Sequence, residues 1–518
     1  MRSSRAILLV TNLTAVLVLG ASASLLAATL SGYWHYTVDD AFISFRYAEH
    51  WARGDGLSWN PGGAPQEGYT SVLHVGLLAL TAKLGAPLEV TSKVMGVAGM
   101  VVALLIAAVI AQRQSGGSFL TSLAAVAAGA AALAHVFPVH AVAGLETTLF
   151  AALWMALALA ADDELPSPRR ARLIAALSLG LGLCRPEGNL VAGVTWAALL
   201  LTTRGPERRR LALTALGVYL APAALYFAWR WQRYGLPMPL PFYVKVSGGS
   251  GFQGAEIARD FLGAIPLVIA GLTLLGSAHL TLAGPRWRAL RLLLPAAAFF
   301  TFFLWPEHVM GFDFRFYSPM VPLVLALTAA GLAMASRAGR WTAPVLLLAF
   351  SCSQLPWRDL HAQEAWARSR FEGYALGLDS AHRRLGAALV AAGREWPRPA
   401  PLLAIGDCGV VPYVSDWRTL DTFGLNDSEL ARLRPPRGAA YVERVFAAEP
   451  DVLVLISSTA EAFKPPLPWE ELLYTGALER GFVVMGKVAF ASNYSLWVLA
   501  RADPAGQRVL ETALLSAR

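Results

Sequence analysis

The sequence predicts an α-helical polytopic membrane protein that ends in a water-soluble α/β domain. Of its 518 residues, 56% are hydrophobic and only 15% are charged, whereas soluble proteins carry about 25% charged residues. Long apolar segments alternate with short runs of arginine. The formal net charge of +8 therefore belongs to loops beside a membrane and does not indicate a nucleic-acid-binding protein.

The first apolar segment covers residues 6–30, which carry no charge and are long enough to cross a bilayer. Arg2 and Arg5 precede it, which places the N-terminus in the cytoplasm. A cleaved signal peptide is the alternative, because residues 21–23 are small. Its apolar region is normally only about 7–15 residues long, so we expect a retained first helix.

Ten further apolar segments bring the expected number of transmembrane helices to about eleven. They cover residues 93–111, 119–137, 147–161, 173–184, 189–201, 211–229, 261–282, 292–304, 319–335 and 341–355. Residues 71–84 are also apolar but short, so we expect a helix near the membrane surface.

The arginine runs test this count, because cytoplasmic loops are enriched in arginine and lysine. With eleven crossings every run falls on the cytoplasmic side, namely Arg113, Arg169, Arg170, Arg172, Arg204, Arg208, Arg209, Arg210, Arg286, Arg288, Arg291, Arg337 and Arg340. This agreement requires two short helices on either side of the Arg185-Pro186-Glu187-Gly188 sequence. One tilted helix over residues 173–201 is the alternative, and it would place every later run outside.

An odd number of crossings places the C-terminus outside the cytoplasm. We therefore expect a transmembrane catalytic domain over residues 1–356 and a soluble extracytoplasmic domain over residues 357–518. In the second domain, strand-like runs at 402–405, 452–456, 482–490 and 494–500 alternate with helix-like stretches at 364–392 and 441–448. This alternation is typical of a small α/β domain.

The first outer loop contains the adjacent carboxylates Asp39 and Asp40. Beside a membrane boundary, one carboxylate of such a pair has a raised pKa unless a cation or a donor compensates it. It can then accept a proton from a sugar hydroxyl. We predict Asp39 as the catalytic carboxylate and Asp40 as the residue that orients it. A helix N-cap followed by a solvated charge is the alternative for this pair.

Four cations, Arg46, Arg185, Lys245 and Arg315, are expected at the same outer face, where cations are outnumbered. Arginine binds phosphate oxygens bidentately, and lysine binds them as a point charge. For any single cation, a salt bridge to a neighbouring acid or a contact with ordinary lipid headgroups is the alternative. Four cations in one plane favour a site for a lipid phosphate.

Other polar residues of the outer loops are candidates for contacts with the sugar or the acceptor. These are Asn60, Glu67, Tyr69, Glu146, Glu187, Tyr243 and Asp313. There is no P-loop or GxGxxG motif, so no nucleotide site is indicated. The histidines His35, His50 and His74 lack metal-ligand spacing and are interpreted as structural. The sequence indicates no metal, and a requirement for a divalent metal stays open.

The first outer loop resembles that of a family of membrane glycosyltransferases whose best-known members are the mycobacterial terminal arabinofuranosyltransferases of arabinan synthesis. The resemblance rests on Asp39–Tyr47, Gly54–Gly62 and Glu67–Thr70, read as DDAFISFRY, GDGLSWNPG and EGYT. Later clusters follow in the same order, at residues 144–147, 185–188, 233–245, 311–316, 406–409, 412–413 and 421–427.

This resemblance implies a GT-C type fold and an essential aspartate in the first outer loop, here Asp39 or Asp40. It also implies the transfer of a sugar from a polyprenyl-phosphate carrier to an acceptor outside the cytoplasmic membrane. Two departures leave the sugar open. Pro239-Leu240-Pro241 stands where the family often has Pro-Asn-Thr, and Asp313 is the single aspartate of a shortened motif.

We therefore expect a glycosyltransferase of the bacterial inner membrane, with arabinofuranose as one candidate sugar and a glycan, lipid or protein as acceptor. Its partners would be the lipid-linked donor, the acceptor and membrane lipids, and no nucleic acid. A transporter or flippase for a lipid-linked saccharide is the alternative. Such a protein would be expected to place ionisable residues in mid-membrane and often to contain inverted repeats. A structural or assembly protein is the third class, and it would not need carboxylates and cations clustered on one face.

Overall fold

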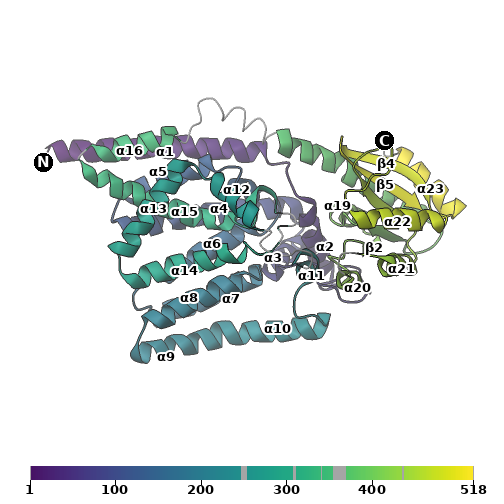
Figure 1. The fold of residues 1–518 in the computed structure, drawn as a ribbon, viewed down its shortest axis with the longest axis horizontal. Helices are drawn as coiled ribbons and strands as arrows, with labels where there is room; N and C mark the ends of the chain where they lie inside the picture. The colour runs from purple at the N-terminus through teal and green to yellow at the C-terminus, as the bar shows by residue number, and fades with distance from the viewer. Residues whose placement is uncertain are drawn as a thin grey trace. The chain divides into compact units, whose positions relative to one another are not determined.

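The computed structural model describes residues 2–246, 254–306, 308, 311–339, 341–353, 369–433 and 437–516 (Figure 1). The chain forms two compact units. The first contains residues 1–34, 92–228 and 250–368, and the second contains residues 35–91, 229–249 and 369–518. Each unit is therefore assembled from segments that are far apart in the sequence.

Every one of the eleven predicted apolar segments overlaps one helix or two or three consecutive helical elements. These elements are α1 (Arg2–Gly32), α4 (Leu88–Ser115), α5 (Phe119–Ala132), α6 (Thr147–Ala160), α7 (Pro168–Cys184), α8 (Gly188–Thr202), α9 (Gly205–Thr214) with η2 (Ala215–Leu220) and α10 (Ala221–Tyr234), α12 (Gly254–Gly263) with α13 (Leu267–Leu282), α14 (Arg286–Phe302), α15 (Val321–Ala335) and α16 (Thr342–Ser353). The expected surface helix is also present, as α3 (Val72–Lys83).

Length and apolar composition identify the strongest candidates for membrane spans. Within the described residues, four continuous helical stretches qualify, namely Arg5–Gly32, Leu88–Ser115, Gly205–Tyr234 and Phe312–Ala338. The pair α12 and α13 makes a fifth if it is counted as one span. Five apolar helices are shorter: Val72–Lys83, Phe119–Ala132, Thr147–Ala160, Gly188–Thr202 and Thr342–Ser353.

The chain between α7 and α8 is non-helical, as the arginine runs predicted. Arg185 adopts an extended conformation with φ −152° and ψ 144°. It precedes Pro186, and a residue before proline is disfavoured in the helical region. Gly188 then lies so close to α7 that an added Cβ would come within 2.2 Å of the Leu181 carbonyl oxygen. The alternative of one tilted helix over residues 173–201 is therefore wrong.

The prediction of a single apolar helix over residues 261–282 is wrong in one respect, because the structure contains two helices there. Helices α12 and α13 meet at an angle of 99°. Pro266 is the N-cap residue of α13, and it disfavours a helical conformation at the preceding Ile265. Phe261 consequently belongs to α12, where its ring stacks on Tyr317 with centroids 5.1 Å apart.

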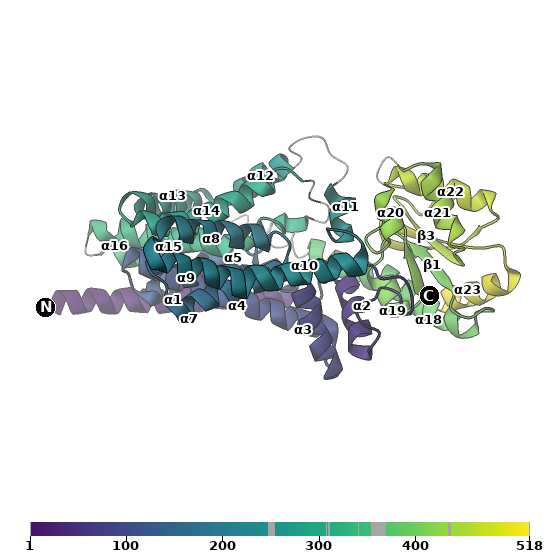
Figure 2. The ribbon, with the colours of Figure 1, turned by 90° about the horizontal axis from the view of Figure 1, so that it is seen from below.

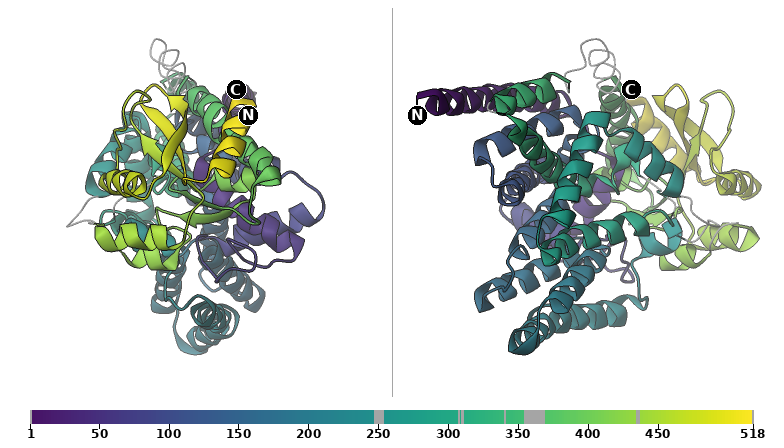
Figure 3. Two further views of the ribbon diagram at one scale, coloured as in Figure 1. Left: turned by 90° about the vertical axis from the view of Figure 1, so that its right-hand side faces the viewer. Right: turned by 60° about the vertical axis from the view of Figure 1, so that its left-hand side comes forward.

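Small residues allow close helix packing in the first unit. Helices α13 and α15 run side by side (Figures 1 and 3). A Cβ on Gly276 would lie 2.1 Å from the Leu327 carbonyl oxygen, and a Cβ on Gly331 would lie 2.1 Å from that of Leu272. Glycine is thus required on both sides of this crossing, as is common where membrane helices approach closely.

The second unit contains a five-stranded mixed sheet in the order β2-β1-β3-β5-β4. Its strands are β1 (Leu402–Ile405), β2 (Arg418–Asp421), β3 (Val452–Ser457), β4 (Val483–Ala491) and β5 (Tyr494–Ala500). Strands β1, β2 and β3 are parallel, while β5 runs antiparallel to β3 and β4. The four predicted strands are confirmed, and β2 was not predicted.

Helices cover both faces of this sheet, as the predicted α/β domain requires. In Figure 2, α21 (Ala439–Ala447) and α22 (Pro468–Glu479) lie on one side, and α18 (Arg384–Glu395) and α23 (Pro504–Ser516) on the other. Leu453, Leu455, Tyr441 and Leu473 belong to the buried core between the sheet and α21 and α22. The predicted helix 441–448 is α21. The predicted stretch 364–392 begins outside the described residues and continues as helix from residue 369.

The second unit also contains the first outer loop, which differs from the predicted division of the chain at 356/357. That boundary itself lies outside the described residues. Helix α2 (Asp39–Arg53) packs against α3 and against α19 (Val410–Ser415). The short helix α11 (Leu240–Val246) packs against α20 (Ser428–Arg432). The first outer loop therefore folds together with the α/β domain.

Candidate functional site

Helix α2 carries the predicted carboxylate pair in its first turn. Asp39 and Asp40 follow Val38, the N-cap residue, whose backbone is extended. Carboxylates are favourable at this position because the N-terminus of a helix carries a partial positive charge. The helix ends at Gly54, whose φ of 103° favours glycine. The sequence predicted a loop here, with a helix N-cap as the alternative.

Asp39 is buried, and both of its carboxylate oxygens accept backbone hydrogen bonds. The amide of Gly409 donates to Oδ2 at 3.0 Å, and the amide of Val410 donates to Oδ1 at 2.8 Å. The Asp39 amide in turn donates to the hydroxyl of Tyr374 at 3.0 Å. Side chain and backbone of Asp39 are thus both held by residues of the α/β domain.

Gly409 leaves no space for any side chain at this contact. A Cβ there would lie 2.1 Å from the Asp39 carbonyl oxygen and 2.4 Å from Oδ2. Gly409 is the N-cap residue of α19 and lies in the Gly406-Asp407-Cys408-Gly409 sequence of the family resemblance. The close approach to Asp39 explains physically why a glycine stands at this position.

A polar network lies beside Asp39. The Nε2 atom of His382 is 2.9 Å from Oδ2 of Asp407, and the Tyr494 hydroxyl donates to the same oxygen. Burial raises the pKa of Asp39 to about 7, and the negative charges of Asp407 and Asp40 act in the same direction. His382 and the amide of Val410 oppose this rise.

His382 is protonated more readily than an ordinary histidine. Its burial acts to lower the pKa, but the hydrogen bond and charge of Asp407, together with the charge of Asp39, outweigh burial and raise the pKa above its usual value. Asp39 and His382 therefore both hold a proton more readily than the free side chains do.

Asp40 differs from Asp39 in its exposure. It lies next to Asp39 in the first turn of α2 and is partly exposed, whereas Asp39 is buried. The structure therefore separates the two carboxylates of the motif. Asp39 is enclosed by backbone amides, and Asp40 is the more accessible one.

Arg46 and Asn60 fix the first outer loop to the segment before β2. Arg46 is 2% exposed, and it donates to the carbonyl oxygens of Trp59 at 2.9 Å, Trp417 at 2.8 Å and Pro412. Asn60 exchanges two hydrogen bonds of 2.9 Å with the backbone of Thr419. Both side chains thus bind backbone groups, and the phosphate and sugar contacts expected of them stay predictions.

Two further predicted residues of this loop lie in internal contacts. Glu67 is 3% exposed and pairs with Arg230, whose Nε donates to Oε1 at 2.9 Å and whose Nη2 donates to Oε2. The Tyr69 hydroxyl is 2.9 Å from that of Tyr234. These contacts join the first outer loop to the end of α10 inside the second unit.

The segment around α11 holds the remaining candidates of this unit. The Tyr243 hydroxyl accepts a hydrogen bond of 3.3 Å from the Met238 amide, and the side chain is half-buried. The backbone of Lys245 belongs to α11. Its side chain lies outside the described part of the structure, so the expected phosphate contact of Lys245 stays a prediction.

In the first unit, Glu146, Arg185, Glu187 and Arg315 form a buried group that we call the Glu146 cluster. Nη2 of Arg315 donates to Oε1 of Glu146 at 3.2 Å. Nη1 of Arg185 lies 3.8 Å from the same oxygen, and Nη2 of Arg185 lies 2.5 Å from Oε1 of Glu187. Two of the four predicted cations, Arg185 and Arg315, thus lie together, and two carboxylates balance their charge.

Each arginine of the Glu146 cluster nevertheless keeps a buried N–H group that has no hydrogen-bond acceptor among the residues that the structure describes. These groups are Nη1 of Arg185 and Nε of Arg315. A buried donor without an acceptor costs about 1–3 kcal/mol. Rings of Phe150 and Phe316 lie 5.5 and 5.4 Å from the Arg185 guanidinium and restrict its movement.

Asp313 precedes Arg315 of the Glu146 cluster by two residues, and its backbone is strained. It has φ 48° in the short helix η3 (Phe312–Phe314), and Phe314 has φ 60°. The Asp313 carbonyl oxygen is 3.0 Å from Nε2 of His140. Left-handed backbone at two successive non-glycine residues is uncommon and is often found at functional positions.

Sequence analysis missed the residues that surround Asp39. Gly409, Val410, Tyr374, His382 and Tyr494 lie more than 300 positions after it, so no local pattern connects them. The available signal was the Gly406–Gly409 motif. Among the described residues, no group of three or more His, Cys, Asp or Glu is arranged to hold a metal ion.

Comparisons with known proteins add to this geometry. A family model described as a domain of unknown function (DUF8728) matches residues 378–509, within the α/β domain. No curated protein matches the sequence.

Among solved structures, the chain is similar to ArnT from Cupriavidus metallidurans bound to undecaprenyl phosphate, with 15% identity and a TM-score of 0.60 over 95% of this chain and 98% of that one. It is also similar to the archaeal oligosaccharyltransferase AglB from Archaeoglobus fulgidus in complex with an inhibitory peptide and a dolichol-phosphate. That similarity has 12% identity and a TM-score of 0.55, and covers 85% of this chain and 69% of that one. The apo form of the oligosaccharyltransferase from the same organism gives 10% identity and a TM-score of 0.54 over the same shares.

At these identities the similarity is one of fold. The protein has the fold of the GT-C membrane glycosyltransferases, and it is a multi-pass membrane protein. The similarity to ArnT extends over the helices and the C-terminal α/β domain alike, because it covers nearly the full length of both chains.

Proposed function

We propose that this protein is a glycosyltransferase that moves a sugar from a polyprenyl-phosphate donor to an acceptor outside the cytoplasm. One observation carries the proposal. The fold matches, over 95% of the chain, that of ArnT in a structure bound to undecaprenyl phosphate. The carboxylate pair at the start of α2 supplies the acid–base group that such a reaction requires.

The reaction replaces one bond at the anomeric carbon with another. The bond from this carbon to the phosphate oxygen breaks, and polyprenyl phosphate leaves with the electron pair. The acceptor hydroxyl forms the new bond and gives its proton to a carboxylate. This description fits an inverting transfer; in a retaining one, the same carboxylate first acts as nucleophile.

We assign the carboxylate role to Asp40 and a positioning role to Asp39, the reverse of the order expected from the sequence. Two features support the reversal. Both oxygens of Asp39 accept backbone amide hydrogen bonds, and Asp39 is buried while Asp40 is partly exposed. A group that exchanges a proton with a substrate has to be accessible to it.

Arg185, Arg315 and Lys245 are proposed to stabilise the phosphate as it leaves. Preorganised donors aimed at developing negative charge are usually the largest single contribution to catalysis. The buried N–H groups of Arg185 and Arg315 that lack an acceptor support this role. Glu146 and Glu187 then orient the two guanidinium groups, and Asp313 and Tyr243 remain candidates for contacts with sugar or acceptor.

The contacts of Arg46, Asn60, Glu67 and Tyr69 support structural roles instead, because each side chain is engaged within the second unit. The sugar stays open, with arabinofuranose as one candidate, and the acceptor is a glycan, a lipid or a protein. A divalent metal requirement stays open as well.

We further propose a location in the bacterial inner membrane, with a cytoplasmic N-terminus and an extracytoplasmic α/β domain. The arginine runs support this orientation. Reporter fusions after Arg172 and Arg291 should give a cytoplasmic signal, and fusions after Gly56 and Arg418 an outer one. A cytoplasmic signal at Arg418 would contradict the orientation.

The function is tested with purified protein in liposomes that contain radiolabelled polyprenyl-phosphate sugars and a mixed acceptor fraction. We expect the label to enter acceptor, with release of one polyprenyl phosphate per sugar. Asp40→Asn should lower the rate of transfer by roughly 100-fold, whereas Asp55→Asn, at an exposed carboxylate of the same loop, should not. Movement of intact donor between leaflets without transfer would instead identify a flippase.

A further inference from the structure

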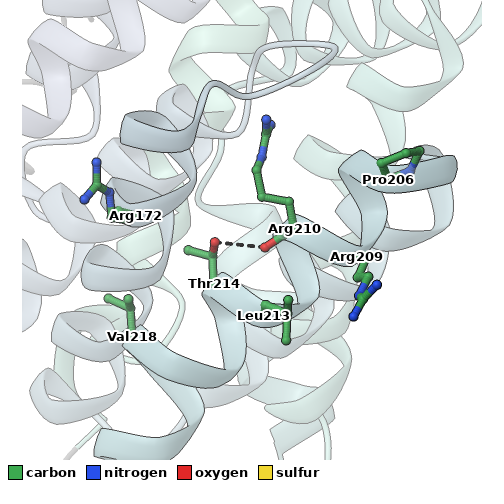
Figure 4. Close-up of a pocket in the computed structure, with 7 residues that line it drawn as sticks. All are labelled: Arg172, Pro206, Arg209, Arg210, Leu213, Thr214 and Val218. Atoms are coloured by element: carbon green, nitrogen blue, oxygen red, sulfur yellow. Dashed lines mark hydrogen bonds between the residues drawn. The ribbon is translucent and has the colours of Figure 1, made fainter.

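An open pocket of about 460 Å³ lies in the first unit, among arginines that the proposed reaction does not use (Figure 4). Arg172 of α7 lines it, together with residues of α9 and of the following segment η2. The complete lining is Arg172, Pro206, Arg209, Arg210, Leu213, Thr214 and Val218. Helix α7 packs directly against η2, which forms one side of this pocket.

Two of its three arginines have no anionic partner. Arg172 and Arg209 are exposed, and neither forms an ion pair with any residue that the structure describes. In Figure 4 they lie at opposite sides of the pocket, with Leu213 and Thr214 between them. Such guanidinium groups are suited to bidentate binding of phosphate oxygens.

The third arginine is fixed within the protein. Nη2 of Arg210 donates to the Pro166 carbonyl oxygen at 2.6 Å and lies 2.5 Å from a carboxylate oxygen of Glu207. The Thr214 hydroxyl donates to the Arg210 carbonyl oxygen at 2.9 Å, the interaction drawn in Figure 4. Arg210 thus shapes the pocket, while Arg172 and Arg209 provide its uncompensated charge.

An apolar surface continues from the pocket along the same helix. The stretch Gly205–Tyr234 is 30 residues long, with a mean hydropathy of 1.8 and only 17% of its most apolar window buried. Leu213, Leu216 and Leu220 are 58%, 55% and 49% exposed. Between the arginines and the rest of the helix, η2 has a π-helical backbone, a feature frequent at functional sites.

We propose that this pocket binds the headgroup of an anionic phospholipid, with the acyl chains lying along the exposed leucines. Two unpaired arginines beside a lipid-facing helix have the chemistry for a phosphodiester with an apolar tail, and basic pockets between transmembrane helices are known to bind anionic headgroups. A free phosphate ion would use the arginines but not the apolar surface. The proposal is independent of the glycosyltransferase reaction.

The test uses the full-length protein in a neutral detergent, with cardiolipin as the anionic probe and phosphatidylethanolamine as the zwitterionic one. Native mass spectrometry measures the fraction of protein that retains each lipid. The pocket variant is Arg172→Gln/Arg209→Gln. The control variant, Arg169→Gln/Arg208→Gln, removes the same charge from the same two helices, at exposed arginines that do not line the pocket.

We expect the wild type and the control variant to retain cardiolipin in preference to phosphatidylethanolamine. The pocket variant should bind cardiolipin at least about tenfold more weakly, given the contribution of each arginine to anionic lipid binding. Equal losses in both variants would show a diffuse charge effect and overturn the proposal, as would no loss in either. Binding of inorganic phosphate at matched ionic strength as tight as that of cardiolipin would overturn the assignment to a lipid. Equal melting temperatures in detergent establish that the variants are folded.

Discussion

The carboxylate of Asp39 accepts a hydrogen bond of 3.0 Å from the backbone amide of Gly409, a residue 370 positions later in the chain. A second amide, that of Val410, donates to the other carboxylate oxygen. The start of the first outer loop is therefore held by main-chain groups of the α/β domain. Any account of the Asp39-Asp40 pair has to separate this anchoring from chemistry at the substrate.

Substitution of each aspartate by asparagine distinguishes anchoring of the loop from catalysis. Asp40→Asn should lower the turnover number by the roughly 100-fold typical of losing a general base and leave the melting temperature unchanged. In Asp39→Asn, the new amide group faces a backbone N–H group, which should cost about 1–3 kcal/mol of unfolding free energy. Transfer assays and thermal unfolding in detergent measure the two effects, with Asp55→Asn as the control. If Asp40→Asn keeps a normal turnover number while a fully folded Asp39→Asn loses turnover, Asp39 is the catalytic carboxylate.

Gly409→Ala tests the same contact from its other side. The new methyl group would lie 2.1 Å from the Asp39 carbonyl oxygen, so helix α2 or the Gly409 backbone has to move. We expect a lower melting temperature and a loss of transfer activity. Gly373→Ala is the matched control, since its Cβ would meet nothing within 4 Å on a helix of the same unit. Similar behaviour of the two variants would mean that the close approach at Gly409 is unimportant.

The raised pKa of Asp39 predicts how stability depends on pH. The pKa is about 7 in the folded protein and 3.8 in the unfolded chain, so the folded state binds the proton more tightly. The contribution of Asp39 to the free energy of unfolding should therefore fall as the pH rises from about 4 to about 7, and stay constant above that range. Thermal unfolding measured across this range should show a flatter profile for Asp39→Asn than for the wild type. Parallel profiles would contradict the raised pKa.

The buried pair Glu67–Arg230 should matter for stability and not for sugar binding. Glu67→Gln leaves the Arg230 guanidinium buried without its counter-charge, which typically costs about 3–5 kcal/mol. Glu67→Leu/Arg230→Met should recover most of this loss, because apolar replacement of a complete buried pair is often tolerated. Asp260→Asn, at the exposed Arg259–Asp260 pair, should cost less than about 1 kcal/mol. An increased KM for an acceptor in a fully stable Glu67→Gln variant would return Glu67 to the binding site.

Arg315 tests the proposed phosphate contacts. Arg315→Ala should reduce the turnover number by about 10²–10³-fold, the range found when one donor to developing charge is removed. Arg315→Lys keeps the charge but loses the bidentate geometry, so it should recover activity only partly. Steady-state kinetics with varied donor measure both effects, and Arg208→Lys, at an exposed arginine, is the control. Unchanged donor kinetics in both Arg315 variants would exclude a phosphate contact and indicate that Arg315 serves only as the ion-pair partner of Glu146.

The helical part of the fold was predictable because it depends on local composition. Each of the eleven apolar segments predicted between the arginine runs overlaps helical backbone, and the break between α7 and α8 lies at Arg185, where the arginine runs required two short helices. The bend between α12 and α13 also had a local signal, Pro266, that was not used. Strand β2 was missed because Arg418-Thr419-Leu420-Asp421 is only four residues long and has a charge at each end, so it lacks the alternation that indicates a strand.

The candidate site was predictable only in its residue types. The sequence located the carboxylates and arginines but not their partners, because hydrogen bonds to backbone groups leave no mark in composition. Arg46 illustrates this. As an isolated cation it indicated a lipid phosphate, whereas it donates to three main-chain carbonyl oxygens, two of them more than 360 positions away. Glu146 and Glu187, predicted to contact sugar or acceptor, form ion pairs with arginines that the sequence pattern did not indicate.

The interleaved second unit has a consequence for synthesis of the chain. At about 5–20 residues per second, a ribosome needs roughly 20–75 s to add the 370 residues that separate Asp39 from Gly409. During that interval the nascent first outer loop lacks the amides and carbonyls that later bind Asp39 and Arg46. The loop therefore stays without these hydrogen-bond partners, open to proteases or chaperones, until the last third of the polypeptide emerges. A premature stop codon before β1 would leave helices that can insert into the bilayer but a loop that cannot complete its fold.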